Sequence, residues 1–369
     1  MKTPGVYIVE KNTSPCFVEE VPTAVPAFVG YTEKATDAGS SLLNKPWRIS
    51  SMSQFYSYFG GAPSPRFSLT DEPGIRFQDK NYGVRRQNRY SFYYQMLLFY
   101  ANGGGPCYVV SVGSYGDELE GAKLEAGIAL LRQEREPTLL VIPEAKDCYA
   151  LQRAMMHHCT AVTRNRFAIL DVYDGYKDQT DPSGDCVKAF RDNIGREGLG
   201  FAAAYYPWLD TSVLSEQEVD FTCLELAGLQ AALTDELTAS AWSKEQKTQI
   251  QAIVDKLGSE PDPAQTTLLH RTLLSMSPLY RELLKKACGE LNRLPVSAAI
   301  AGIYTRVDNS RGVWKAPANT GVAMVVSPTV LIGKAVNAIR TFIGEGIKVW
   351  GGPWTGTRST GGISMSAGR

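Results

Sequence analysis

The sequence predicts an α/β protein with a mainly parallel sheet and flanking helices, and three observations support this fold class. Between residues 107 and 206, short apolar segments typical of strands alternate with longer segments that have helical spacing. The chain is 44% hydrophobic, 21% charged and 10% aromatic, which is enough apolar material for a sizeable core. Its 369 residues exceed what one core usually holds, so we expect a smaller α+β part as well.

The smaller part is expected toward the N-terminus. An apolar stretch at 21–31, bounded by prolines, predicts a strand, and residues 46–51 predict a second extended segment. Residues 53–60 predict a short helix, and the aromatic run at 90–102 predicts another helix, which glycines end. Residues 62–90 are rich in Pro, Arg and Asp without periodicity, so we expect a surface loop there.

The α/β part is expected to begin with a buried strand at 107–112. Further strands are predicted at 138–142, 166–172 and 201–206, and helices at 121–135, 147–163 and 182–196. Because a helix separates each strand from the next, the strands should run parallel. A charged stretch at 210–292 predicts a helical insertion, and helices are expected again at 295–304 and 336–343.

Charge and composition exclude several classes of partner. The 38 basic and 38 acidic side chains cancel, which removes the electrostatic argument for binding nucleic acid or an anionic membrane. No apolar run approaches the roughly 18 to 20 residues of a membrane-spanning helix, and the N-terminus has no secretory apolar region. The seven cysteines have no C-x-x-C spacing, so we expect reduced thiols and no zinc site. A soluble protein made in the cytoplasm is predicted.

Parts of a serine hydrolase are present, but their pattern does not predict one. Asp171 ends a predicted strand, His157 and His158 lie in a predicted helix, and Ser297 follows Pro295. No G-x-S-x-G turn surrounds any serine, and the two histidines are expected on a helix surface. The prediction is therefore that the protein is not an enzyme, with a hydrolase kept as the alternative.

Cofactor and metal sites are not predicted either. Gly103–Gly105 lies between a helix and a strand, the reverse of the order in a phosphate-binding loop. Gly302, Gly312 and Gly321 lack the spacing of a dinucleotide-binding fingerprint, and the basic run 85–89 is expected to be a solvated loop. Five aspartates do not follow a calcium-loop pattern, which favours a polar loop: Asp171, Asp174, Asp178, Asp181 and Asp185.

The first 20 residues predict an extended N-terminal arm. A β-prone stretch follows a Pro-Gly turn and is isolated from the rest of the chain by a polar tract: Val6, Tyr7, Ile8, Val9 and Glu10. Its backbone groups need partners, and the edge of another subunit's sheet would supply them. If donor strand and acceptor edge are different surfaces, the contact is heterologous and repeats into rings or a helix. A homo-oligomer is expected.

Several segments together resemble the contractile tail sheath proteins of bacteriophages and of extracellular contractile injection systems. They occur in order over most of residues 1–351, at 3–10, 21–30, 49–61, 99–112, 295–308, 311–319 and 337–351. The most specific stretch reads P-V-S-A-A-I-A-G-I-Y-T-R-V-D and then R-G-V-W-K-A-P-A-N. The core positions of this motif are Arg306, Asp308, Arg311, Gly312, Trp314, Lys315, Pro317 and Asn319.

The resemblance implies a structural subunit that polymerises helically around an inner tube and contracts to drive the tube through a target envelope. It implies a subtilisin-like domain without catalytic residues, arms shared between neighbouring subunits, and contraction as a rigid-body change of packing without nucleotide. Implied partners are neighbouring sheath subunits, an inner tube protein, and baseplate and terminator proteins. The protein would be made in the bacterial cytoplasm and work in a virion tail or an extracellular particle.

Domain boundaries follow from the predicted elements and the resemblance. We expect an arm at 1–20, the N-terminal part of the core domain at 21–104, the α/β sheath domain at 105–305, the start of a C-terminal core domain at 306–351, and an atypical tail at 352–369. The family pattern stops after Gly351, and an out-of-frame reading of a family-like continuation can yield this tail. We hypothesise a frameshift there, with a natural short variant as the alternative. A chain lacking the C-terminal arm should polymerise poorly.

Overall fold

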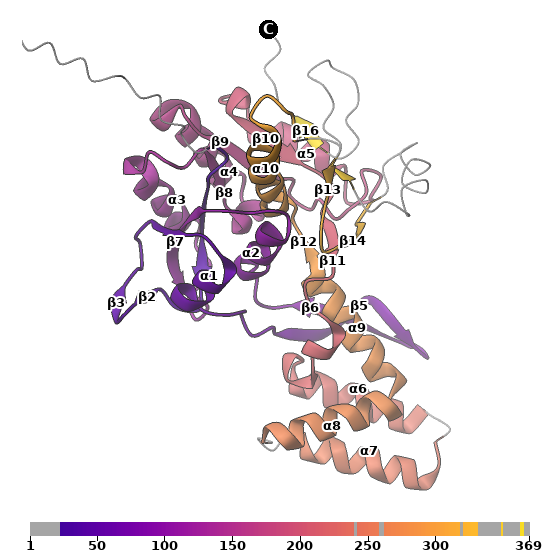
Figure 1. Ribbon diagram of the computed structural model, residues 1–369. Helices are drawn as coiled ribbons and strands as arrows, with labels where there is room; N and C mark the ends of the chain where they lie inside the picture. The colour runs from indigo at the N-terminus through magenta and orange to yellow at the C-terminus, as the bar shows by residue number, and fades with distance from the viewer. Residues whose placement is uncertain are drawn as a thin grey trace, which may run out of the picture.

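The computed structural model describes residues 23–239, 242–257, 262–317, 320–330, 348–349 and 362–364 (Figure 1). The predicted arm at 1–20, the predicted helix at 336–343 and Asn319 lie outside the described residues. The hypothesis of a frameshift after Gly351 stays a prediction, because the fold does not test it.

A seven-stranded sheet with the order β16-β10-β9-β8-β1-β7-β4 forms the centre of the protein. Its strands are β1 (Pro26–Thr32), β4 (Trp47–Ile49), β7 (Cys107–Ser114), β8 (Leu139–Val141), β9 (Phe167–Asp171), β10 (Ala202–Tyr205) and β16 (Gly362–Ser364). β1, β7, β8, β9 and β10 run parallel, whereas β4 and β16 pair antiparallel at the two edges. The predicted mainly parallel α/β sheet is therefore confirmed.

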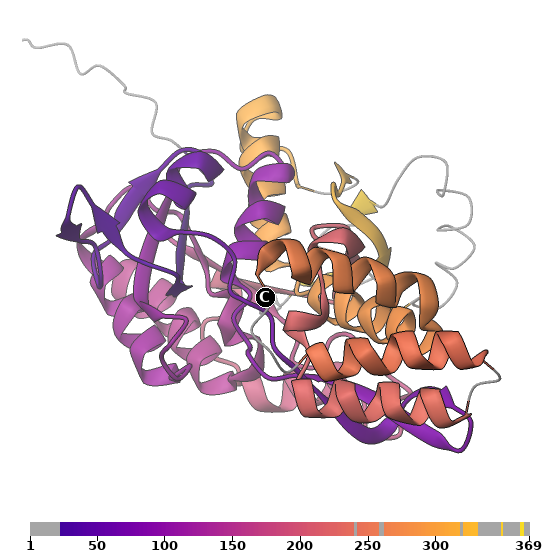
Figure 2. The ribbon, with the colours of Figure 1, turned by 90° about the horizontal axis from the view of Figure 1, so that it is seen from below.

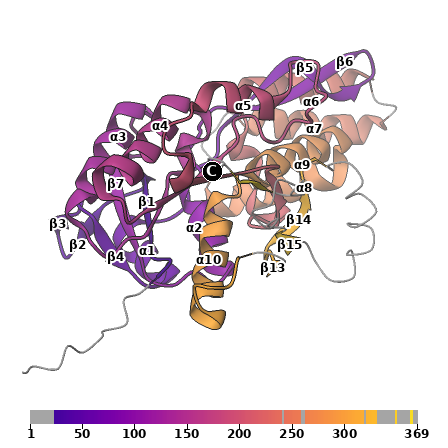
Figure 3. The same ribbon diagram turned by 90° about the horizontal axis from the view of Figure 1, so that it is seen from above.

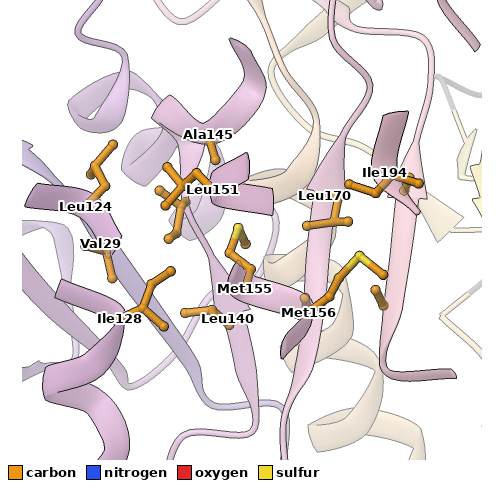
Figure 4. Packing of buried hydrophobic residues seen from close by; sticks show 14 of the residues in the cluster. Val29, Leu124, Ile128, Leu140, Ala145, Leu151, Met155, Met156, Leu170 and Ile194 are labelled. Carbon is orange, nitrogen blue, oxygen red and sulfur yellow. The ribbon is translucent and has the colours of Figure 1, made fainter. Parts of the chain in front are cut away.

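The helices that connect the parallel strands cover one face of this sheet. They are α3 (Gly121–Leu130), α4 (Tyr149–His157) and α5 (Cys186–Ile194), and Figure 3 shows them together on one side. Their apolar side chains pack against alternate residues of the strands, as Figure 4 shows for Ile128 and Met155 beside Val29 and Leu140. Since each side chain is almost completely buried, hydrophobic burial fixes these helices to the sheet.

The other face of the sheet is covered by α1 (Met52–Phe59), α2 (Phe92–Ala101) and α10 (Ser297–Arg311). α10 carries small residues where it meets α2. A Cβ atom at Gly302 would lie 2.4 Å from the backbone oxygen of Phe99, so only glycine allows this approach. Thr305 also donates a 2.8 Å hydrogen bond to the backbone oxygen of Ala24, which joins α10 to the start of β1.

A helical projection extends away from the sheet (Figures 1 and 2). It contains α6 (Leu226–Ala239), α7 (Lys244–Lys256), α8 (Pro263–Met276) and α9 (Pro278–Asn292), so the expected helix-rich stretch contains four described α-helices. A separate hydrophobic cluster holds these helices against a hairpin of β5 (Phe67–Phe77) and β6 (Lys80–Arg86).

The surface loop predicted at 62–90 is wrong, because this hairpin occupies most of it. Phe67, Tyr82 and Val84 are buried against helices that lie more than a hundred residues later in the chain. The basic run predicted as a solvated loop lies partly in β6, where the half-buried Arg86 donates to the backbone oxygen of Tyr90 at 2.5 Å. Packing against helices from a distant part of the chain therefore stabilises strands in a segment whose own sequence pattern does not predict them.

The remaining strands are short and form small sheets separate from the central one. They are β2 (Thr36–Asp37), β3 (Ser40–Ser41), β11 (Leu209–Thr211), β12 (Arg293–Leu294), β13 (Thr320–Gly321), β14 (Val325–Pro328) and β15 (Lys348–Val349). β11 lies between β12 and β14, so the chain before and after the projection meets at its base. The predicted domain boundaries stay predictions, although β1 shares the central sheet with strands from beyond residue 105.

Candidate functional site

The candidate site is the C-terminal half of α10 and the turn after it, where most of the family-like positions lie. Arg306 points back onto the body of the protein: its Nη2 donates to the backbone oxygen of Gly321 at 2.8 Å. Its aliphatic part lies over Gly103, which has a φ of +93° and no room for a side chain. Arg306 therefore ties α10 to β13 and to the turn after α2.

Asp308 joins α10 to the first described residue of the chain. Partial burial raises the pKa of Asp308 above its usual value, and a hydrogen bond from the hydroxyl of Thr23 to the carboxylate opposes this only in part. The chain therefore enters the described fold beside the last turns of α10.

The turn after α10 is exposed, and we call residues Arg311–Lys315 the α10 tip. Gly312 ends the helix with a φ of +83°, and its N–H donates to the backbone oxygen of Asp308 at 2.9 Å. Val313 and Trp314 are 62% and 86% exposed, and both basic side chains also face solvent. Pro317 follows and is half-buried.

Asp171 and Ser297, two residues considered for the hydrolase alternative, do meet, but as a helix cap. Asp171, at the end of β9, accepts hydrogen bonds at 3.0 Å and 2.9 Å from the backbone N–H groups of Val296 and Ser297. Ser297 is 1% exposed and is the first residue of α10. A carboxylate at a helix N-terminus satisfies donors that the helix itself cannot pair, so the contact positions α10.

The histidines lie at the opposite end of β9. His158 accepts a 2.8 Å hydrogen bond from Arg166, which directly precedes the strand that Asp171 ends. Five residues of strand separate the two places by on the order of 15 Å. The histidines therefore do not join Asp171 and Ser297, and no catalytic triad forms from these residues. The expectation of surface histidines is wrong for His158, which is 4% exposed, and holds for His157.

Arg166 was not expected from the sequence and forms a buried network at this end of the sheet. Its guanidinium donates to the backbone oxygens of Pro137 at 3.1 Å, Leu131 at 2.8 Å and Glu134. These carbonyls belong to the segment between α3 and β8, where the negative end of the α3 dipole attracts a cation. Since Arg166 is always charged, His158 must accept through a neutral ring nitrogen.

The stability of the protein is expected to fall in mild acid because of His158. Burial, Arg166 and His157 lower its pKa from 6.5 to about 4. A depressed pKa means that protonation opposes folding, so stability is complete above pH 6.5 and is lost as the pH falls toward 4. After allowance for solvent screening, we expect a loss of roughly 2 kcal/mol. Urea unfolding at pH 7 and pH 4 measures it.

His158→Gln is the matched variant, because glutamine keeps an acceptor for Arg166 but does not titrate. Its unfolding free energy should change less between the two pH values than that of the parent protein. Equal losses in both proteins would show that other groups cause the acid sensitivity.

The remaining polar segments serve local structure. Asp178 and Asp181 accept hydrogen bonds from Thr180 and Ser183 in tight turns, and Asp185 caps α5. Asp174 forms an ion pair with Lys177. Within the described ranges, no three His, Cys, Asp or Glu side chains are arranged to hold a metal ion.

A groove of about 480 Å³ between α3 and α4 was also not expected from the sequence. Apolar side chains line it together with side chains of both signs, among them Arg132, Arg153, Glu125 and Glu197. Mixed charge of this kind selects no class of ligand. Among the described residues, no helix has the combination of length and hydrophobicity needed to cross a bilayer.

Comparison with protein-family models and with curated proteins finds no match. Among solved structures, the chain is similar to one in the 6-fold symmetrised baseplate of the anti-feeding prophage, with 21% identity, a TM-score of 0.47, and 95% of this chain and 68% of that chain covered. A chain in the contracted helical sheath of the anti-feeding prophage is 20% identical, with a TM-score of 0.47, and 95% of this chain and 68% of that chain are covered. A chain in the contracted PVC sheath complex of an extracellular contractile injection system is also 20% identical, with a TM-score of 0.47, and 95% of this chain and 66% of that chain are covered. This chain is thus similar, over most of its length, to chains in sheath and baseplate structures.

Proposed function

We propose that this protein is a structural, non-enzymatic subunit of a contractile sheath. Subunits would polymerise helically around an inner tube, and contraction of the sheath would drive the tube through a target envelope. The main observation in support of this proposal is that family-like segments far apart in sequence pack together around α10. Gly302 meets Phe99, Arg306 covers Gly103, and Thr305 bonds to the residues before β1.

The proposed partners are neighbouring copies of this chain, an inner tube protein, and baseplate and terminator proteins, with neither nucleic acid nor membrane. The equal numbers of basic and acidic residues favour self-association, since no net charge opposes it. Synthesis in the bacterial cytoplasm and work in a virion tail or an extracellular contractile particle belong to the same proposal.

We further propose that the α/β part has a subtilisin-like shape without the catalytic chemistry. The cap that Asp171 forms on α10 supports this, because the carboxylate faces backbone N–H groups and the histidines lie at the far end of β9. Contraction would then be a rigid-body change between two packings of subunits. A serine-directed probe tests the hydrolase alternative: labelling that Ser297→Ala abolishes would overturn the proposal.

The proposed role of the N-terminal arm can be tested directly by mutation. Replacing Val6, Tyr7, Ile8 and Val9 with serine keeps the length of the arm but removes its β-propensity and apolar contacts. We expect the parent protein to form oligomers and this variant to remain monomeric, measured by sedimentation velocity and electron microscopy with and without tube protein. The loss follows because a donor strand binds mainly through an extended backbone and alternate side chains.

A matched control replaces four polar residues of the same arm, Lys11 to Ser14, with glycine and serine. It should associate as the parent protein does. Assembly of the serine variant equal to that of the parent protein would contradict the proposed role of the arm.

A further inference from the structure

The α10 tip exposes more apolar surface than a solvated turn needs. Trp314 is 86% exposed and its neighbour Val313 is 62% exposed, at the end of a helix whose other apolar residues are almost all buried. Figure 3 shows the C-terminal end of α10 extending beyond the elements around it. Adjacent exposed apolar residues at a protruding position favour a contact with another segment of protein.

The same tip carries positive charge. Arg311 and Lys315 flank the two apolar residues, are exposed, and form no ion pair with any other described residue. The nearest acidic side chain along the helix, Asp308, is half-buried and hydrogen-bonded to Thr23. The tip therefore offers an apolar centre between two cations, which fits an apolar and acidic segment.

A segment of that composition lies next to the tip along the chain. The four residues Phe17-Val18-Glu19-Glu20 end three positions before Thr23, which the structure places at Asp308. Three to six residues of extended chain span roughly 10 to 20 Å, and one helical turn from Asp308 to Gly312 covers about 6 Å. The base of the arm is therefore attached within reach of the α10 tip.

We propose that Phe17–Glu20 of the same chain docks on the α10 tip. Phe17 and Val18 cover Val313 and Trp314, and the two glutamates pair with Arg311 and Lys315. The contact fixes the base of the arm and leaves residues 1–15 to extend in a defined direction. This goes beyond the proposed sheath function, since an arm anchored on its own subunit is a property of the isolated chain.

A disulfide-formation experiment tests the contact, because Cys16 lies directly before the docking residues. In the full chain carrying Val313→Cys, oxidation should link Cys16 to residue 313 within one molecule. The other cysteines outside the arm are buried or, for Cys148, half-buried, and peptide mapping separates any link to them. Leu268→Cys, which is 66% exposed on α8, gives the background rate for an accessible residue of the projection.

Charge reversal supplies the decisive comparison. Adding Arg311→Glu and Lys315→Glu should slow the link at 313 by about tenfold or more, because the effective concentration of Cys16 at the tip falls. Adding Glu19→Lys and Glu20→Lys to that variant should restore the rate. All four substitutions are at arm or exposed positions, and unchanged thermal unfolding confirms that the fold is kept.

Three results overturn the proposal. The first is a linking rate that charge reversal does not change, since the arm would then only pass near the tip. The second is a concentration-dependent link between two molecules, since a second copy would then supply the arm. The third is a rate at 313 no higher than at 268. Each can occur whether or not the protein assembles into a sheath, so the test is independent of the proposed function.

Discussion

Replacing Arg166 with methionine is expected to lower the free energy of unfolding by about 4 kcal/mol, measured by urea unfolding at pH 7. The methionine fills part of the volume but donates no hydrogen bond. The backbone oxygens of Leu131, Glu134 and Pro137 would then stay buried without this donor, and each such loss costs on the order of 1 to 3 kcal/mol. His158 would lose its partner as well.

Arg132→Met is the matched control, because Arg132 is an exposed arginine in the turn that the Arg166 guanidinium caps. Its removal should change stability by no more than about 0.5 kcal/mol. If Arg166→Met cost as little as Arg132→Met, water would be satisfying the freed carbonyls, and the buried network would not hold the α3 to β8 connection.

Most of the central sheet could be predicted because its signal is local. Strands at 107–112, 138–142, 166–172 and 201–206 are short apolar runs between helices, and each corresponds to an observed strand within a few residues. The β5–β6 hairpin could not be predicted in this way. Its apolar residues are spaced by Pro73 and Gly74 and become a strand pair only against helices of the projection.

For the polar sites, the sequence indicated some of the residues that matter but not what they do in the structure. Asp171 and Ser297 were singled out, yet sequence spacing does not show that β9 ends at the first turn of α10. The sequence contains only a weak indication of the role of Arg166, because a lone arginine before a strand is common and its three carbonyl partners come from elsewhere in the chain. That indication is its position at the start of an apolar run. An arginine that is buried with such a run must find hydrogen-bond acceptors for its N–H groups.

Replacing Asp171 with alanine should destabilise the protein by about 3 kcal/mol, with guanidinium unfolding at neutral pH as the measurement. The carboxylate accepts from two backbone N–H groups at the start of a buried helix of 15 residues. Without it, these donors and the positive end of the helix dipole would face the core unpaired. α10 carries the contacts to β1, α2 and β13, so its displacement would spread to the α10 tip.

Asp171→Asn separates the hydrogen bonds from the charge. The amide oxygen of asparagine can accept from the same two N–H groups, so this variant should lose only about 1 kcal/mol, the part due to charge at the helix N-terminus. Ser297→Ala removes only a buried hydroxyl beside the cap and should have a smaller effect than Asp171→Ala. Equal losses for the alanine and asparagine variants of Asp171 would mean that charge alone matters. In that case hydrogen-bond geometry would not be what seats α10 on the sheet.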